Sequence, residues 1–91
     1  MRIEFDPTKS QKNADDRQLP FDLVVEFDWD AAIVVEDTRN RYPERRFEAI
    51  GPVCNRLHVV VFAAIDGGVR VISFRKANVR EEKRYEKFRT A

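Results

Sequence analysis

The fold predicted for this chain follows from one stretch of its sequence, Leu57-His58-Val59-Val60-Val61-Phe62-Ala63-Ala64-Ile65-Asp66-Gly67-Gly68-Val69-Arg70-Val71-Ile72-Ser73-Phe74-Arg75. Two runs rich in β-branched and aromatic residues, 57–64 and 69–75, flank a short turn, a pattern typical of a β-hairpin. Glycine in the turn supplies the positive φ that tight hairpin connections need. Because residues 59–62 are all apolar, both faces of this strand must be covered, and we expect it at the centre of a sheet.

Further strands are predicted on the N-terminal side of this hairpin. Their apolar patterns indicate strands over residues 2–5, 32–36 and 45–50, with a polar loop over 37–44. Gly51-Pro52 is predicted as the turn that separates the strand 45–50 from the strand 57–64. In the strand 45–50, Arg46, Glu48 and Ile50 share one face, whereas Phe47 and Ala49 share the other.

Three helices are expected beside the sheet. Asp6 and Pro7 form a helix start, because Asp caps free backbone N–H groups and Pro fits the first helical position. The helix that follows, 7–17, has almost no apolar stripe and is expected to lie on the surface. A second helix is predicted over 21–28, with a broad apolar face and Trp29 packed at its end.

A last helix is predicted from Asn78 to about residue 88. Asn78 and Glu81 have the spacing of a capping box, and Tyr85 with Phe88 would form the apolar face that packs on the sheet. The predicted order is therefore β-α-α-β-β-β-β-α. Connections this short favour antiparallel pairing, so the fold class is α+β with a small, mostly antiparallel meander and flanking helices.

Length and composition indicate one small domain spanning residues 1–91. With 43% hydrophobic residues and three glycines, the chain can fill a single core. Cys54 is the only cysteine, so an internal disulfide is impossible, and a reducing, cytoplasmic location is expected. The apolar runs are far shorter than the ~20 residues of a membrane span, and the acidic N-terminal segment is unlike a signal peptide.

The charge is divided unevenly along the chain. Residues 1–37 hold four basic and ten acidic side chains, a net charge of −6, whereas residues 38–91 hold 13 basic and six acidic ones, a net charge of +7. Such an asymmetry suggests a face for an anionic partner. The alternative is a dipole that only aids solubility.

A basic stripe is predicted on the last helix, because four cations follow one another at i, i+3, i+4 and i+7. They repel one another unless an anion lies between them, and Arg75 and Lys76 precede them, which favours a phosphate site. A solvated charged helix is the alternative. The four residues are Arg80, Lys83, Arg84 and Lys87.

A second basic group surrounds the predicted turn at Tyr42. Arginine is prominent there, and its planar guanidinium suits phosphate contacts. Tyr42 could stack on an unpaired RNA base or pack over the sheet as a turn residue. The group consists of Arg39, Arg41, Arg45 and Arg46.

The sequence contains no pattern that predicts a metal or cofactor site. Cys54 and His58 alone cannot complete a tetrahedral metal site. The glycines are explained by turns and form no phosphate-binding loop. We therefore expect neither a metal nor a cofactor.

Several motifs are spread over nearly the whole chain, in its N-terminal, middle and C-terminal parts. They are Phe5-Asp6-Pro7-x-Lys9 with Asn13, then Phe21, then Arg39-Asn40-Arg41-Tyr42-x-Glu44-x-Arg46-Phe47-x-Ala49-Ile50-Gly51, and Val71-Ile72-Ser73-x-Arg75-Lys76-Ala77-Asn78-x-Arg80-Glu81. Together these stretches resemble the BrnT family, the toxin half of a bacterial type II toxin–antitoxin pair.

This resemblance implies both a fold and an activity. The expected fold is that of the RelE ribonucleases, and the expected activity is RNA cleavage that halts translation. The resemblance also implies a BrnA-like antitoxin with a ribbon-helix-helix domain, through which the complex would bind operator DNA. The chain departs from the common family pattern in two places: Asp16-Arg17-Gln18 replaces Lys-His-Gly, and Pro43 replaces Gly.

Roles in a metal-free ribonuclease follow from the resemblance and from residue chemistry. Arg46 and Arg75 match the family motifs and are expected to stabilise charge on the phosphorane. Glu44 is the expected base, with Glu48 next and His58 a third choice. The expected RNA-binding residues are Arg39, Arg41, Tyr42, Lys76, Arg80, Lys83, Arg84 and Lys87.

Two readings other than a ribonuclease stay open at this point. In the first, the same basic surface binds RNA or the antitoxin without cleaving RNA. In the second, the chain is a purely structural domain whose basic face pairs with an acidic protein segment.

Overall fold

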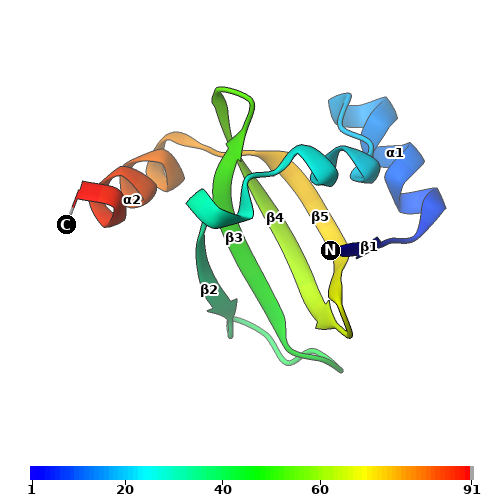
Figure 1. The fold of residues 1–91 in the computed structure, drawn as a ribbon. Helices are drawn as coiled ribbons and strands as arrows, with labels where there is room; N and C mark the ends of the chain where they lie inside the picture. The colour runs from blue at the N-terminus through cyan, green and yellow to red at the C-terminus, as the bar shows by residue number, and fades with distance from the viewer. Residues whose placement is uncertain (91) are drawn as a thin grey trace.

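The computed structural model describes residues 1–90 and has a five-stranded sheet in the order β1-β5-β4-β3-β2 (Figure 1). The α+β class and the mostly antiparallel sheet are confirmed. The elements in chain order are β1 (Arg2–Glu4), α1 (Pro7–Arg17), the 3-10 helices η1 (Phe21–Glu26) and η2 (Trp29–Ala31), β2 (Ile33–Asp37), β3 (Arg46–Val53), β4 (Arg56–Ile65), β5 (Gly68–Lys76) and α2 (Val79–Thr90).

The hairpin that decides the fold forms as predicted, with β4 at the centre of the sheet. Strands β4 and β5 pair antiparallel across a tight turn in which Gly67 has a φ of 76°. Strands β3 and β2 continue the antiparallel meander on one side. On the other side β1 pairs with β5 in parallel, which the long connection between these two strands permits.

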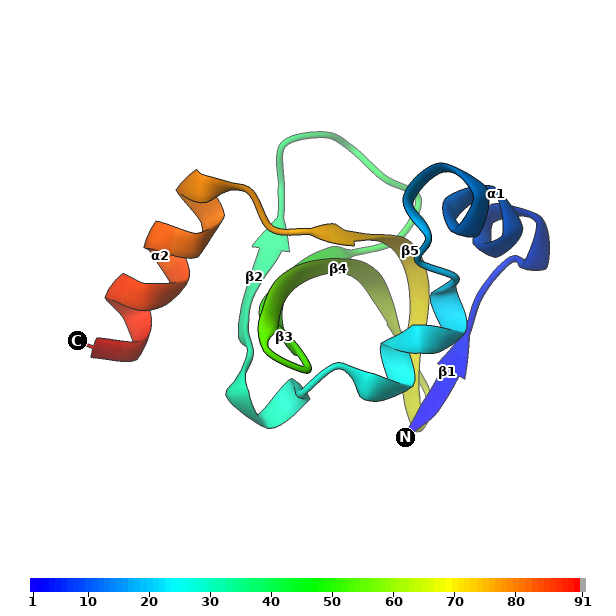
Figure 2. The ribbon, with the colours of Figure 1, turned by 90° about the horizontal axis from the view of Figure 1, so that it is seen from above.

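The sheet has an inner face and an outer face, and apolar residues of β4 contribute to both. Figure 2 shows the sheet curled around η1 and η2, with α1 and α2 at opposite sides. Val60, Phe62 and Phe74 lie in the inner core with side chains of η1. Val59 lies in a smaller outer cluster with Ile50. The all-apolar run of β4 is therefore buried on both faces, as its sequence indicates.

The second predicted helix forms, but as 3-10 helix rather than α-helix. Phe21, Val24 and Phe27 are buried at a spacing of three residues, which is the period of a 3-10 helix. Val25, which an α-helical wheel places with them, is 68% exposed. Trp29 packs edge-on against Phe27 and against a core phenylalanine of β4, so its expected place at the end of this segment is confirmed.

The predicted turn at Gly51-Pro52 is wrong, because both residues lie inside β3 and the turn is at Cys54 and the next residue. The carbonyl of Pro52 accepts a hydrogen bond from the Asp28 N–H at 3.0 Å, on the side away from β4. The missing N–H of Pro52 faces the same side, so no β3–β4 bond is lost. Gly51 is needed for packing, since a Cβ there would lie 2.9 Å from the Phe27 ring.

Helix α1 is attached to the edge of β5 through polar groups. Asp6 caps it by accepting from the Thr8 N–H at 2.9 Å, as predicted. The Asn13 amide donates to the carbonyls of Leu19 at 2.6 Å and Phe74 at 2.8 Å. These bonds place the end of α1 beside the last residues of β5.

Helix α2 packs on the sheet through less apolar surface than the sequence predicts. Tyr85 is half-buried, and its hydroxyl donates to the Ala31 carbonyl at 2.6 Å. Phe88 is 62% exposed, so its expected packing on the sheet is wrong. The reason is that only the start of α2 lies against the sheet, while its C-terminal turns extend beyond β2 (Figure 1). Within residues 1–90 no helix is long and apolar enough to cross a lipid bilayer.

Candidate functional site

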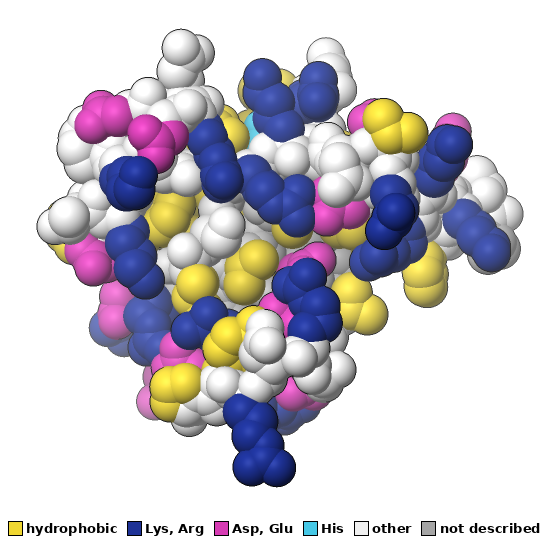
Figure 3. Space-filling model, turned by 180° about the vertical axis from the view of Figure 1, so that it is seen from behind, with side chains coloured by type: hydrophobic (Ala, Val, Ile, Leu, Met, Phe, Trp, Pro, Cys, Tyr) yellow, Lys and Arg dark blue, Asp and Glu magenta, His cyan; other side chains and the backbone are white. Residues whose placement is uncertain are grey.

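A hollow lies on the outer face of the sheet, at the start of α2. We call it the α2 groove; its volume is about 420 Å³. Figure 3 shows lysine and arginine side chains spread over this face of the molecule. The groove is lined by Val35, Glu36, Asp37, Thr38, Arg39, Glu48, Arg75, Asn78, Arg80, Glu81 and Arg84.

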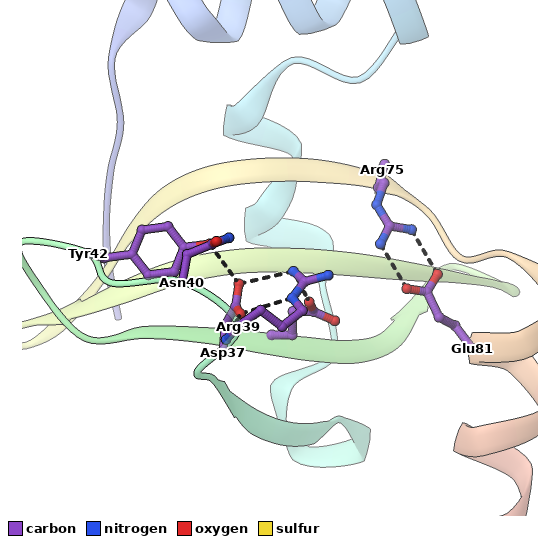
Figure 4. A network of polar contacts seen from close by, with 7 residues as sticks. Asp37, Arg39, Asn40, Tyr42, Arg75 and Glu81 are labelled. Carbon is purple, nitrogen blue, oxygen red and sulfur yellow. Dashed lines mark hydrogen bonds and ion pairs between the residues drawn. The ribbon is translucent and has the colours of Figure 1, made fainter.

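Arg75 is fixed in the α2 groove by a bidentate ion pair with Glu81. Its two Nη atoms lie 2.7 and 2.8 Å from the two carboxylate oxygens (Figure 4). The Glu81 carboxylate also accepts from the Asn78 N–H, and the Asn78 side chain accepts from the Glu81 N–H, both at 2.9 Å. The predicted capping box is thus confirmed, and it holds Arg75 at the start of α2.

Arg75 and Glu81 each stabilise the charged form of the other. The Arg75 guanidinium holds the pKa of the Glu81 carboxyl below its usual value of 4.5, because it hydrogen-bonds the ionised form. The hydrogen bond to Glu81 likewise raises the pKa of Arg75. The Arg75 side chain is still 32% exposed, so one part of the guanidinium faces solvent and an incoming anion.

Arg39 forms the opposite wall of the groove and is positioned by a buried carboxylate. Its Nε and Nη2 atoms each lie 3.0 Å from Asp37, whose side chain is 3% exposed. Arg39 holds the pKa of Asp37 below its usual range by hydrogen bonding to the charged form. Asp37, which the sequence places in a loop, is the last residue of β2.

Glu48 is a carboxylate of the groove that forms an ion pair with Arg39. Its Oε2 atom lies 3.1 Å from Arg39 Nη2, and its side chain is 14% exposed. Glu48 also acts electrostatically on Arg75, raising the pKa of that guanidinium further. The groove therefore holds the Glu48 carboxylate beside the guanidinium of Arg39, and it also contains Arg75.

A second hollow of about 320 Å³ lies under the loop 38–45 and holds the other predicted catalytic residues. Arg46 lies over the Tyr42 ring with its guanidinium carbon 4.0 Å from the ring centroid. The Tyr42 hydroxyl donates to Asp37 at 3.4 Å. Glu44 forms an ion pair with Arg70, which lowers the pKa of that carboxyl.

Arg46 and Arg75 lie on the same face of the sheet but not in the same hollow. Arg75 is in register with Val59, and Val59 with Ile50. Arg46 is four residues from Ile50 along β3, a separation of about 13 Å along the strand. The structure therefore groups Glu44 with Arg46, and it groups Glu48 with Arg75.

The predicted RNA-binding residues are distributed over three places. Arg39, Arg80 and Arg84 line the α2 groove, with Arg75 between them. Lys76 lies in an adjacent hollow of about 310 Å³. Tyr42 lies in the second hollow; the remaining ones, Arg41, Lys83 and Lys87, are exposed.

Arg17 shares the hollow of Lys76 with Arg75, a placement that sequence reasoning missed. The available signal was its position, since it stands where the family commonly has His. At the end of α1 the backbone turns at Gln18, whose φ is 60°, the left-handed conformation that a glycine adopts readily. The common family glycine is thus replaced by a residue that takes the same conformation.

His58 lies away from the groove, on the inner face. Its ring contacts Phe74, its Nδ1 lies 2.8 Å from the Arg56 carbonyl, and burial lowers its pKa. It therefore contacts no residue that lines the groove. No group of three His, Cys, Asp or Glu side chains with metal-binding geometry occurs in residues 1–90.

A small, mostly antiparallel sheet with flanking helices, and a groove on its outer face lined by four arginines and four carboxylates, define a compact α+β protein. Comparison with models of protein families shows to which family the chain belongs. The family model of BrnT, the ribonuclease toxin of type II toxin–antitoxin systems, matches residues 5–81, so the chain belongs to this family. Its members are ribonuclease toxins, and a type II system implies an antitoxin partner. No curated protein and no solved structure gave a match.

Proposed function

We propose that this chain is a metal-independent endoribonuclease toxin whose active site is the α2 groove. The observation that carries the proposal is the position of Glu48, 3.1 Å from Arg39 and in the same groove as Arg75. A ribonuclease without a metal needs a base for the 2′-OH and cations for the phosphorane, and this groove contains both kinds of group.

In the proposed reaction Glu48 takes the proton of the 2′-OH. The 2′-oxygen then forms a bond to the adjacent phosphorus, and Arg75 and Arg39 stabilise the negative charge on the equatorial oxygens. The bond from phosphorus to the 5′-oxygen breaks, and the leaving oxygen takes a proton from solvent. The products are a 2′,3′-cyclic phosphate and a 5′-hydroxyl.

Glu44 and Arg46, the base and cation favoured by the sequence, are assigned other roles in this proposal. Both lie in the second hollow, away from Arg75, where Glu44 pairs with Arg70 and Arg46 packs on Tyr42. The loop 38–45 carries Arg39, so both residues support the conformation that places Arg39 beside Glu48. The remaining predicted cations would bind RNA phosphates outside the scissile bond; they are Arg41, Lys76, Arg80, Lys83, Arg84 and Lys87.

The antitoxin of this chain is proposed to be a ribbon-helix-helix protein of the BrnA type. An acidic antitoxin segment that covers the α2 groove would block RNA by occupying Arg75, Arg80 and Arg84. Operator DNA would be contacted through the antitoxin.

Single-turnover cleavage of a saturating RNA in the presence of EDTA tests the assignment, with thermal melts as the control for folding. Glu48→Gln and Arg75→Ala are each expected to lower the cleavage rate by ~10²-fold or more. Glu44→Gln and Arg46→Ala should lower it much less. Arg84→Ala should weaken RNA binding with little change in the chemical step. Equal losses for Glu48→Gln and Glu44→Gln would contradict the choice of base.

The alternative function is a binding module that holds RNA or antitoxin without cleaving RNA. The observation that favours it is Arg17, which stands at the common family histidine and cannot act as a proton donor or acceptor at neutral pH. If the wild-type chain binds RNA and antitoxin but produces no 2′,3′-cyclic phosphate ends, this alternative replaces the enzymatic proposal.

A further inference from the structure

The α2 groove continues across the outer face as far as helix α1. Arg75 lines both the groove and the neighbouring hollow, which contains Arg17 and Lys76. Arg17 in turn lines a further hollow of about 310 Å³ along α1, which contains Lys9 and Lys12. The three hollows follow one another from α2 over the end of β5 to α1, and Arg75 and Arg17 each line two neighbouring ones; we call this series the track. Lysine and arginine side chains extend over this face in Figure 3.

Five cations of this track have no carboxylate partner within residues 1–90, whereas Arg39, Arg75 and Lys12 of the same track each form an ion pair. Lys9, Arg17, Lys76, Arg80 and Arg84 form no ion pair with any side chain of residues 1–90. Unpaired like charges along one track repel one another, so an anionic ligand would relieve a cost that the isolated chain carries.

Arg17 is held in the track by the structure around it. It is the last residue of α1, where the helix dipole favours a cation. One turn earlier, Asn13 binds the Phe74 carbonyl and so ties this end of α1 to β5, next to Arg75. The Arg17 side chain is exposed, and its only polar contact within residues 1–90 is a long one of 3.5 Å to Asn13. It is therefore positioned by the backbone and available to a ligand.

We propose that α1 forms a second RNA-binding subsite, in which Arg17 and Lys9 bind backbone phosphates of the strand that is cleaved in the α2 groove. This inference rests on the proposed function for the identity of the ligand as RNA. A small anion would fill one hollow, whereas a flexible single strand presents a phosphate at every nucleotide and follows a bent track. The acidic residue in this part of the track, Asp16, is occupied by Lys12 at 2.8 Å.

RNA binding tests the proposal independently of catalysis if the RNA cannot be cleaved. The probe is a fluorescent single-stranded 12-mer with 2′-O-methyl groups throughout, titrated at several salt concentrations. For Arg17→Ala we expect affinity at low salt to fall about fivefold to tenfold, and the slope of log K against log salt to decrease by about 0.7, the contribution of one phosphate contact. The double variant Lys9→Ala with Arg17→Ala should decrease this slope by about 1.4, the contribution of two phosphate contacts.

Arg2→Ala is the matched control, because it also removes one exposed arginine but lies at the other end of β5, opposite Gly68. It should leave the salt slope unchanged. A tetramer of the same RNA, which is too short to span the track, should lose little affinity on Arg17→Ala if it occupies the α2 groove. An equal loss for Arg2→Ala and Arg17→Ala would show a general charge effect and overturn the subsite.

The outcomes separate this inference from the proposed function. If unmodified RNA is cleaved by the wild type and Arg17→Ala binds the 12-mer as tightly as the wild type, the subsite is wrong and the enzyme stands. If the 12-mer depends on Arg17 but no RNA is cleaved, the subsite stands and the catalytic proposal is wrong. If the wild type does not bind the 12-mer at all, the track is not an RNA site.

Discussion

The Glu81 carboxylate binds Arg75 through both oxygens, at 2.7 and 2.8 Å, while it also caps α2 by accepting from the Asn78 N–H. One side chain therefore fixes the start of a helix and the orientation of a cation in the candidate site. Any change at Glu81 acts on both, because the two sets of hydrogen bonds end on the same carboxylate. The site and the stability of α2 are coupled by this geometry.

Replacing Glu81 is expected to lower both stability and activity. Glu81→Gln removes the charge that Arg75 binds, and we expect the free energy of unfolding to fall by about 2 kcal/mol. RNA cleavage should fall as well, since Arg75 loses its fixed orientation. Urea unfolding and single-turnover cleavage measure the two effects. Glu86→Gln, on an exposed and unpaired residue of the same helix, is the control and should change neither.

Stability should decrease as the pH falls from neutral to acid. His58 has a pKa below its usual 6.5 in the folded chain, so the unfolded state binds a proton first and stability starts to fall below pH 6.5. Glu81 and Asp37 have pKa values below 4.5 and 3.8, so their contribution is complete above those values and is lost as the pH falls through the lowered ones. Urea midpoints between pH 3 and 7 measure this decline.

The Glu81→Gln variant separates the contribution of this carboxylate to the loss of stability at acid pH from that of His58. Glu81→Gln should flatten the decline below pH 4.5 and leave the decline between pH 5 and 6.5 unchanged, because only the carboxyl group has been removed. A variant whose whole profile runs parallel to that of the wild type would contradict the assignment of this carboxylate.

Asn13→Ala is expected to loosen the attachment of α1. The substitution leaves the Leu19 and Phe74 carbonyls without their donor, and we expect a loss of about 1–3 kcal/mol in the free energy of unfolding. Gln11→Ala removes an amide of the same helix that bonds only to exposed Asp15, and it should cost less than about 0.5 kcal/mol. Similar losses for the two variants would argue against the attachment role of Asn13.

Induction of this chain alone should arrest bacterial growth, with loss of RNA following soon afterwards. Glu48→Gln should permit growth at the same soluble level, because the groove would bind RNA without a base. Growth curves measure the arrest, immunoblots measure the soluble level of the protein, and RNA gels measure the loss of RNA. Arrest by Glu48→Gln as strong as that by the wild type would show that toxicity does not need this carboxylate.

Association with the antitoxin should be fast and should slow as salt is added. The groove presents Arg75, Arg80 and Arg84, so a complementary acidic segment would be steered to it by charge. Stopped-flow association rates at increasing ionic strength test this expectation. A rate that does not change with salt would mean that the antitoxin binds elsewhere.

Local features of the chain were determined by the sequence itself. The apolar run of β4 required burial on both faces, the glycine of the hairpin permitted its turn, and Asn78 with Glu81 capped α2. Each of these depends on residues that are neighbours along the chain. The spacing of apolar residues, the turn residues and the helix caps can therefore be predicted from the sequence alone.

Only the tertiary structure decided which charged residues meet. Glu44 and Glu48 look alike in sequence, but Glu44 pairs with Arg70, 26 residues away, whereas Glu48 pairs with Arg39. The path of the loop 38–45, which carries Glu44 and Arg39, sets these partners. The tertiary structure also decided the place of Pro52, which resembles a turn residue but lies in β3. The strand tolerates it because its missing N–H faces away from β4. Arg17 meets Arg75 because α1 lies along the edge of β5, an arrangement that depends on contacts between residues distant in sequence.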